Sequence, residues 1–371
     1  MKILAINWQD LTNPQAGGAE IHLEEILKRI AAKGHQVTLF CSSYPQARKV
    51  ERINGIEIIR KGSRHNFNFV VSRYIKSLLA LKKPDLIIED INKIPFYTPL
   101  FQNLSTLVVI PHLFADSVFK EINFILGLYI FFAEKPIPQI YKNKKIMVIS
   151  ESTKHDLMRR KIPEKDIHVI HCGIDHSFYF PDSEIKKSDF PLAIYVGRLK
   201  KYKSIDSLIQ ALPLVLKRLP DAELAIIGDG DYGPELKRLT QRLGLEGKVK
   251  FTGFVSQKEK VSWLRKAWVA VYPSLKEGWG LSNIEANACG TPVLASDVPG
   301  LKDSVVSGET GFLFEYGDKE KLAELMIKIM SDSSLRKKLS QGGLRWAQEF
   351  NWDKATDQTL ELLQMVAREK K

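Results

Sequence analysis

The chain has 371 residues, of which 44% are hydrophobic and 26% are charged, and its net charge is +12. This length exceeds what one ordinary core supports, so two domains are expected, and the composition is that of a soluble globular protein. The three cysteines, Cys41, Cys172 and Cys289, are odd in number and far apart, which argues against a disulfide framework or a metal cluster and favours the reducing cytosol.

The positive charge is spread over both halves of the chain. Residues 1–185 hold 25 Lys and Arg against 19 Asp and Glu, and the rest hold 30 against 24, so each half has a surplus of six. Two interpretations stay open: a basic protein with some phosphate-binding lysines, or attraction to anionic lipid headgroups. Nucleic-acid binding is not expected, because the sequence has no zinc-finger spacing, RNP pattern or basic tract.

The first half of the chain alternates short apolar runs with amphipathic ones. Residues 2–6 read as a strand that starts at once, without the apolar region and cleavage site of a signal peptide. Leu23, Ile26, Leu27 and Ile30 mark one face of a helix over residues 20–33. Further strands are expected at residues 37–41, 85–88 and 106–110.

The most apolar segment covers residues 122–133 and is flanked by Lys120 and Lys135. Its twelve residues are too few to span a bilayer, which takes about twenty. The sequence allows a buried helix of the first domain or an interfacial helix that meets a membrane. Both interpretations can hold for different faces of one helix.

The second half repeats the alternation. Helical patterns cover residues 205–219 and 257–267. This order predicts an α/β fold with parallel sheets covered by helices on both faces, once in each half. Glycine and proline place the domain boundary near residues 173–182. Strands are expected at residues 192–196, 223–227, 249–252, 269–272 and 292–296.

The most informative motif lies in residues 274–293. Glu277 and Glu285 stand eight residues apart, with a glycine-rich turn between them that runs into a helix. Such a turn leaves backbone amides free at the positive end of the helix, where a phosphate binds. Carboxylates on each side can accept hydrogen bonds from sugar hydroxyls. The arrangement suits a nucleotide sugar, with the diphosphate in the middle, the hexose on one side and the ribose on the other.

These residues resemble the retaining glycosyltransferases of family 4, the group 1 glycosyl transferases, which have the GT-B fold. The pair Glu277 and Glu285, followed by Ala-Cys-Gly-Thr-Pro, is similar to the family's E-x7-E element. Residues 196–203 resemble its G-R-L…K segment, and residues 16–20 resemble its glycine loop. The match runs through nearly the whole chain and is densest from residue 196 to residue 311.

The resemblance implies two Rossmann-like parallel-sheet domains that face an interdomain cleft. An acceptor-binding domain would cover residues 1–176 and a nucleotide-sugar-binding domain residues 177–352. A C-terminal helix at about residues 353–371 would cross back onto the first domain. Because ligands of open α/β sheets lie beyond the carboxyl ends of the strands, the nucleotide would bind in the cleft.

The resemblance also implies residue roles. Arg198 and Lys203 would grip the donor diphosphate and stabilise the leaving nucleotide, since fixed cations offset the charge on the departing oxygen. Glu277 would face the transferring sugar, and His112 would lie close to it. Contacts to the donor would come from Gly17, Gly18, Gly197, Gly228, Gly230, Phe254, Val255, Gly278, Trp279, Gly280, Leu281, Ser282 and Glu285.

Plainer interpretations stand beside these roles. Arg198 and Lys203 would otherwise belong to a solvated basic loop, and Gly17 and Gly18 to an ordinary strand-to-helix turn. Ser282-x-x-Glu285 has the pattern of a capping box, in which the glutamate only closes a helix N-terminus. His112 would otherwise be a structural histidine; in the family the residue after this histidine usually differs from Leu113.

No cofactor and no metal are expected. Asp229 and Asp231 form an Asp-x-Asp triplet, which glycosyltransferases of a different fold use to bind a metal. Here the triplet follows a strand and matches a G-x-G turn, and the sequence shows no other cluster with ligand spacing.

The predicted function is therefore retaining transfer of a hexose from a nucleoside diphosphate sugar to an acceptor hydroxyl. A lipid-linked or cell-envelope glycan acceptor is favoured, and a soluble sugar or another polymer stays open. The enzyme would be cytoplasmic, with peripheral attachment to an anionic membrane left open. The alternatives are a nucleotide-sugar epimerase of the same fold and a non-catalytic membrane-associated scaffold. A dehydrogenase is disfavoured, because no G-x-G-x-x-G follows the first strand.

Overall fold

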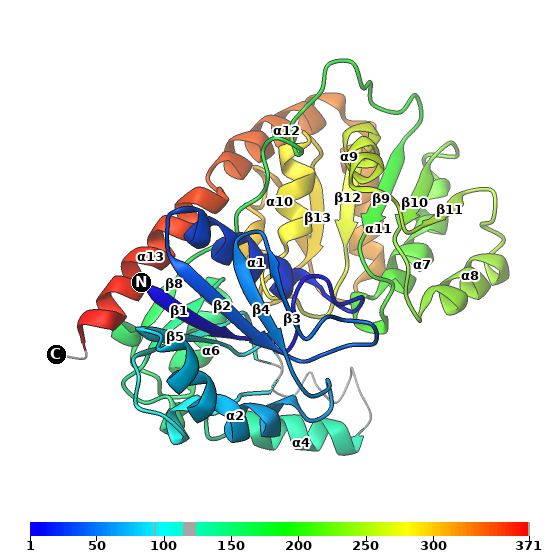
Figure 1. Cartoon of the computed structure of the whole chain (residues 1–371). Coiled ribbons are helices and arrows are strands. Elements are labelled where there is room, and N and C mark those ends of the chain that lie inside the picture. The colour runs from blue at the N-terminus through cyan, green and yellow to red at the C-terminus, as the bar shows by residue number, and fades with distance from the viewer. Residues whose placement is uncertain (93, 114–123, 370–371) are drawn as a thin grey trace. The chain divides into compact units, whose positions relative to one another are not determined.

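A computed structural model gives the structure of the chain and describes residues 1–92, 94–113 and 124–369 (Figure 1). The chain divides into two compact units. The first comprises Met1–Gly173 and Trp352–Lys371, and the second comprises Ile174–Asn351. The division falls three residues before the boundary expected from the sequence, because the Ile174 amide donates to the Phe350 carbonyl at 3.2 Å, within the second unit.

The first unit holds an eight-stranded sheet in the order β3-β4-β2-β1-β5-β6-β7-β8. All neighbours pair in parallel except β3 and β4, which form an antiparallel hairpin. Asn54 and Gly55 turn this hairpin with positive φ angles of 50° and 82°, as a two-residue hairpin loop requires. The strands are β1 (Lys2–Ile6), β2 (Gln36–Cys41), β3 (Val50–Ile53), β4 (Ile56–Arg60), β5 (Leu86–Asp90), β6 (Thr106–Ile110), β7 (Lys145–Val148) and β8 (Ile167–Val169).

The helices of the first unit include one that comes from the far end of the chain. α13 (Trp352–Arg368) packs against α1 (Gly18–Ala32), where Arg29 Nε lies 2.9 Å from Asp353 Oδ1 and Lys33 Nζ lies 2.6 Å from Asp357 Oδ1. The other helical segments are α2 (Phe67–Lys82), η1 (Thr98–Leu100), α4 (Phe124–Glu134), α5 (Ile137–Ile140), α6 (Glu151–Arg159) and η3 (Glu164–Asp166).

The apolar segment of the sequence forms α4, which lies beside α2 in Figure 1 and is joined to it by a hydrogen bond from Asn68 Nδ2 to the Tyr129 hydroxyl. The interpretation of this helix as a buried core element is wrong, because only Gly127 and Glu134 are buried along it. Residues 120, 122 and 123, which the sequence interpretation included, lie outside the described residues.

The second unit holds a six-stranded sheet in the order β11-β10-β9-β12-β13-β14, and all neighbouring strands are parallel. Its strands are β9 (Leu192–Val196), β10 (Glu223–Ile227), β11 (Val249–Gly253), β12 (Val269–Tyr272), β13 (Val293–Ser296) and β14 (Gly311–Phe314). Its helical segments are η4 (Lys201–Lys203), α7 (Ile205–Leu216), α8 (Gly233–Arg242), α9 (Gln257–Lys266), α10 (Leu281–Ala288), η5 (Lys302–Ser304), α11 (Lys319–Ser331) and α12 (Ser333–Gln348).

Two Rossmann-like parallel sheets confirm the α/β class predicted from the sequence. Strands such as β9 are buried along their whole length, as expected where helices cover both faces of a parallel sheet. The strand order reverses beside β1 in the first sheet and beside β9 in the second. Ligands of open α/β sheets bind beyond the carboxyl ends of the strands at such a reversal, so the loops after β1 and β9 are the places to look for a site.

Within the described ranges, no helix combines the length and the apolar character that crossing a lipid bilayer demands.

Candidate functional site

The loop after β9 carries the two cations that the sequence singled out. Arg198 is exposed, and its carbonyl accepts a hydrogen bond from the Tyr195 hydroxyl at 3.1 Å. Gly197 precedes it with a φ of 156°, and a Cβ at this position would lie 2.8 Å from the Tyr195 hydroxyl oxygen. Glycine is therefore needed for the turn that leads from the buried strand to Arg198 at the surface of the sheet edge.

Lys203, at the end of η4, forms an ion pair with Glu277 in the loop after β12. The two side chains are 16% and 21% exposed, so the pair is largely enclosed but reachable from solvent. Burial by itself lowers the pKa of Lys203, but the charge of Glu277 outweighs it and holds the pKa of the lysine above its ordinary value. A cation and a carboxylate that lie 74 residues apart in the sequence thus meet at one sheet edge.

The backbone of the loop that carries Glu277 lies very close to Gly300. Gly300 has a φ of 87°, and a Cβ there would lie 2.1 Å from the Glu277 carbonyl oxygen. The loop then turns at Gly280, with φ 81°, into α10, which begins at Leu281. The first amides of a helix have no intrahelical partner, so this turn offers donors to an anion.

The capping-box interpretation of Ser282 and Glu285 is wrong. The N-cap of α10 is Gly280 and no side chain caps it, so Ser282 is the second residue inside the helix. A true capping box occurs nearby, where Ser256 and Glu259 close the N-terminus of α9.

Glu285 lies one turn into α10, and its side chain is 9% exposed. Its Oε2 lies 2.7 Å from Lys260 Nζ on α9. The sequence did not single out Lys260, because an ion pair between two helices leaves no local pattern.

The side chain of Trp279 is 2% exposed and packs edge-on against Phe350, with ring centroids 4.6 Å apart. Any contact of Trp279 to a donor would therefore come from its backbone. Gly278, Gly280, Leu281 and Ser282 are half-buried, at the surface of the same turn.

Glycines also bring the loops after β9, β10 and β11 into close contact. A Cβ on Gly228 would lie 2.0 Å from the Gly197 carbonyl oxygen, and one on Gly230 would lie 2.3 Å from that of Leu199. The Gly228 amide donates to the Gly253 carbonyl at 2.9 Å. A pocket of about 240 Å³ opens beside these loops, and Gly228, Asp229, Gly230, Lys237, Phe251 and Gly253 are among its lining residues.

Phe254 follows Gly253 at the carboxyl end of β11 and is 88% exposed, whereas Val255 is half-buried. A phenyl ring with so much free surface beside a pocket is available to a ligand.

The Asp-x-Asp triplet lines the same pocket. Asp231 pairs with Lys200 at 2.8 Å, and Asp229 accepts a hydrogen bond from the Gly230 amide at 2.7 Å. Over the residues that the structure describes, no group of three or more His, Cys, Asp or Glu side chains could hold a metal ion.

In the first unit, Gly17 and Gly18 lead into α1 beyond the carboxyl end of β1. Glu20 Oε2 accepts a hydrogen bond from the Gly17 amide at 2.7 Å, and Glu20 Oε1 accepts from Gln9 and Asn92 side chains at 3.1 Å each. This buried carboxylate fixes the glycine loop. His112 is half-buried and follows β6 by two residues.

A buried ion pair in the first unit was missed by the sequence interpretation. Arg60 Nε lies 2.6 Å from Asp10 Oδ2 and Arg60 Nη2 lies 2.9 Å from Asp10 Oδ1, and neither side chain is exposed. Asp10 stands in the loop between β1 and Gly17, so the pair anchors that loop to β4.

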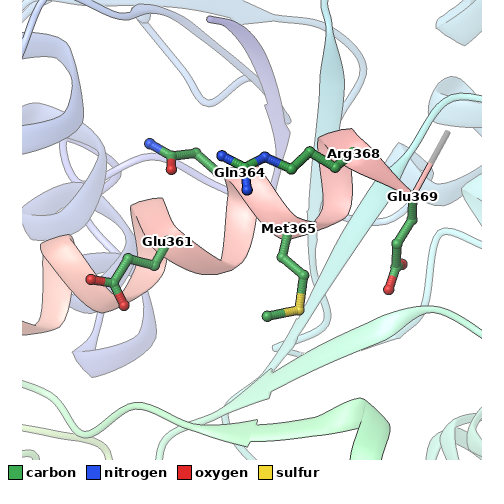
Figure 2. Close-up of a pocket in the computed structure, with 5 residues that line it drawn as sticks. All are labelled: Glu361, Gln364, Met365, Arg368 and Glu369. Atoms are coloured by element: carbon green, nitrogen blue, oxygen red, sulfur yellow. The ribbon is translucent and has the colours of Figure 1, made fainter. Parts of the chain in front are cut away.

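A hollow of about 480 Å³ along α13 is separate from the predicted site residues. Figure 2 shows Met365 between the carboxylates of Glu361 and Glu369 on one side of this helix. Its lining residues come from the last turns of α13 and the residue that follows the helix, so it lacks the converging loops that mark the edge of the second sheet.

Comparison with known families covers most of the chain in two parts. Residues 179–346 match the model of glycosyl transferases group 1, and residues 16–178 match the model of glycosyltransferase family 4. The boundary between the two matches falls near the division between the two compact units.

Individual relatives agree with this assignment. The D-inositol 3-phosphate glycosyltransferase of Streptomyces avermitilis is 34% identical over 183 residues, which are 47% of this chain and 39% of that protein, so the match spans about two fifths of the relative. Sucrose-phosphate synthase from Thermosynechococcus elongatus is 25% identical, with a TM-score of 0.84 over 98% of both chains. Anabaena HepE, solved in complex with UDP and glucose, shares the fold at 20% identity, with a TM-score of 0.76 over 98% of this chain and 100% of that one.

Proposed function

The chain is a glycosyltransferase of the family 4 type, and on that premise we propose that it transfers a hexose from a nucleoside diphosphate sugar to an acceptor hydroxyl, with retention of the anomeric configuration. One observation carries this proposal. Lys203 and Glu277 meet at the carboxyl edge of the second sheet, next to the turn at Gly280 that opens α10.

These groups match the charges of the proposed reaction. The bond between the anomeric carbon and the donor phosphate oxygen breaks, which leaves a negative charge on the diphosphate. Arg198, Lys203 and the first amides of α10 would stabilise that charge, and fixed donors of this kind supply a large share of catalysis. Glu277 would orient both the lysine and the hexose.

Retention through a covalent intermediate needs a carboxylate nucleophile beneath the anomeric carbon. Glu277 is held by Lys203, which favours orientation over nucleophilic attack. We therefore propose same-face attack, in which the acceptor oxygen bonds to the anomeric carbon and its proton passes to the leaving phosphate oxygen. On this mechanism, basic side chains and backbone amides stabilise the negative charge of the leaving diphosphate, and no metal or other cofactor is required.

The nucleotide part of the donor is proposed to bind through groups at the edge of the second sheet. The diphosphate would lie against the α10 turn, the ribose against Glu285 and the base against the loops at Gly228, Gly230 and Gly253, with Phe254 and Val255 beside it. The uridine diphosphate and glucose bound by Anabaena HepE support a donor of this class. The roles of Gly17, Gly18 and His112 toward the sugar and the acceptor stay predictions.

The first test is a thermal-shift screen of UDP-, GDP- and ADP-sugars in the presence of EDTA. A ligand that binds only the native state stabilises it by about 2.7 kcal/mol when its concentration is a hundred times its Kd, and the melting temperature rises accordingly. The best donor is then assayed for transfer with wild type and Arg198→Ala. Because Arg198 is exposed, its removal should leave the fold intact and lower turnover about a hundredfold or more.

Arg242→Ala is the matched control, since Arg242 is an exposed arginine of the same unit at the end of α8. Failure of every nucleotide sugar to stabilise the protein, or equal turnover in the two variants, would contradict the proposal.

We further propose that the acceptor is lipid-linked and that α4 rests on an anionic membrane from the cytoplasmic side. Ile125 is 80% exposed, Phe124 70% and Phe132 54%, and neighbouring Phe69 on α2 is 66% exposed. Exposed apolar side chains that gather on one helix and the start of its neighbour indicate an interaction site, and the positive net charge suits anionic headgroups. Lys135 Nζ lies 4.6 Å from the centroid of the Phe132 ring, so a cation borders the apolar face.

Vesicle flotation tests this attachment. Wild type should float with vesicles that contain phosphatidylglycerol and less with pure phosphatidylcholine, and the double variant Ile125→Ser, Phe132→Ser should remain in the dense fraction. Leu81→Ser is the control, because Leu81 is 73% exposed and lies at the far end of α2 from Phe69. Equal flotation of all three proteins would show that α4 does not carry the membrane contact.

A further inference from the structure

The carboxylate of Glu285 is paired with Lys260, and the ammonium group of that lysine is itself held by Tyr179. Lys260 on α9 approaches Glu285 Oε2 at 2.7 Å, and the ammonium group also donates to the Tyr179 hydroxyl at 2.9 Å. Lys260 and Glu285 are 21% and 9% exposed, and Tyr179 is 4% exposed. The three side chains form a largely buried triad at the first turns of α10.

Tyr179 accepts two hydrogen bonds, and one of them comes from the Lys260 ammonium group. The hydroxyl oxygen accepts from Lys260 Nζ and from Gln257 Nε2. These two bonds fix the hydroxyl oxygen beside the ammonium group of Lys260, which in turn pairs with the Glu285 carboxylate. Burial raises the pKa of the Tyr179 phenol, and the charge of Glu285 raises it further, so the proton stays on tyrosine.

The triad is anchored before any ligand arrives. Arg265, also on α9, donates from Nε to the Phe180 carbonyl at 2.8 Å and lies 3.1 Å from Asp182 through Nη1. These contacts fix the segment that carries Tyr179 to the helix that carries Lys260. The positions of the lysine and the tyrosine are therefore set by the fold.

We propose that Lys260 and Tyr179 are positioning residues for ribose recognition, which act by holding the Glu285 carboxylate in one orientation toward the sugar hydroxyls. A carboxylate has about four acceptor sites, and Lys260 occupies one of them, which leaves sites for a vicinal diol. The ammonium group also compensates a buried negative charge, which is costly when unpaired. This inference rests on the proposed function, because it assumes that Glu285 contacts the ribose.

Nucleotides that lack the ribose hydroxyls separate this role from a general one. Calorimetric titration measures Kd for UDP, GDP and ADP and for their 2′,3′-dideoxy analogues, with wild type, Lys260→Met, Lys260→Arg and Tyr179→Phe. For the base that binds best, wild type should prefer the ribonucleotide by at least about tenfold, since hydrogen bonds to a charged group are strong. Lys260→Met should weaken ribonucleotide binding about tenfold and leave the dideoxy analogue within about twofold.

The other variants test the same mechanism from different sides. Lys260→Arg keeps the charge and should restore most of the preference. Tyr179→Phe removes one hydrogen bond without removing a charge and should reduce the preference about threefold, and it repeats the test if Lys260→Met loses its fold. Lys258→Met is the control, because Lys258 is an exposed lysine on the same helix.

The outcomes are distinguishable. If Lys260→Met keeps the full preference for ribonucleotides, or weakens both kinds of nucleotide equally, the positioning role is wrong while the proposed function stands. If wild type binds equally well to both kinds of nucleotide, the ribose contact of Glu285 is wrong, and the inference falls with it. If wild type binds no nucleotide at all, the proposed function itself is contradicted.

Discussion

Two ion pairs, one at the edge of each sheet, differ in what surrounds them. The pair of Asp10 and Arg60 is bidentate and sealed, with neither side chain exposed. The pair of Lys203 and Glu277 is 16% and 21% exposed and adjoins a turn that leads into a helix N-terminus. Sealed charges can only support the fold, whereas charges that solvent reaches can exchange partners with a ligand. Exposure therefore separates the scaffold of the first edge from the proposed chemistry of the second.

The largest expected effect tests the reachable pair. Glu277→Gln keeps the shape of the side chain but removes its charge, so Lys203 and the hexose lose their common partner. Transfer should fall by roughly a hundredfold to a thousandfold, the loss expected when Lys203 is no longer held in place to stabilise the charge on the leaving phosphate. Steady-state kinetics with the best donor measures the loss.

Glu246→Gln serves as the control for that measurement, because Glu246 is an exposed glutamate of the same unit. Turnover within threefold of wild type in Glu277→Gln would show that the reachable pair is scaffold as well.

Substitution in the sealed pair of Asp10 and Arg60 should change the stability of the protein rather than its catalytic rate. Asp10→Asn leaves the Arg60 charge buried without its main partner, and breaking a buried pair in this way costs about 3–5 kcal/mol of folding free energy. Denaturant unfolding should show this loss, while the folded fraction retains much of its activity. A variant as stable as wild type would mean that Glu51, which also pairs with Arg60, suffices to hold the arginine.

The sequence predicted the buried strands well and the contacts between loops poorly. Bounds of β1, β6, β9, β10 and β12 agree with the prediction, because strands buried on both faces are continuous apolar runs. The hairpin of β3 and β4 was missed, although Asn54-Gly55 is a strong turn signal, since its partly exposed residues show no long apolar run.

The same limit applies to the candidate site. The motif around Glu277 and Glu285 could be predicted because its residues are close in the sequence. The partners of these glutamates, Lys203 and Lys260, are brought to them by the order of strands and helices. The ion pair of Asp10 and Arg60 joins residues fifty positions apart, and no spacing in the sequence indicates it.

Acid should lower the stability of the first unit, because a histidine is buried there in its neutral form. His22 on α1 is 2% exposed, and burial lowers its pKa from 6.5 to about 4. Below pH 6.5 the His22 imidazole takes up a proton in the unfolded chain but stays neutral in the folded chain. Stability therefore falls as the pH drops from about 6.5 to about 4. The shift corresponds to about 3 kcal/mol at the lower end of this window.

The variant His22→Leu tests this dependence, because it cannot take up the proton in either state. Its free energy of unfolding should decline less than that of wild type between pH 6.5 and pH 4. Parallel curves for the two proteins would show that other groups govern the acid response.

The smallest expected effect concerns an ion pair that is open to solvent. Lys200 and Asp231 pair at 2.8 Å with side chains 40% and 71% exposed, and exposed pairs of this kind contribute about 0–1 kcal/mol. Asp231→Asn should thus shift the melting temperature by no more than a few degrees.

The same substitution removes one carboxylate of the Asp-x-Asp triplet, so it also tests the proposed independence from metals. Transfer should persist in this variant and in the presence of EDTA, because the proposed stabilisation of the leaving phosphate comes from Arg198, Lys203 and helix amides. Loss of transfer in both experiments would move the charge stabilisation from the reachable lysine to a metal ion.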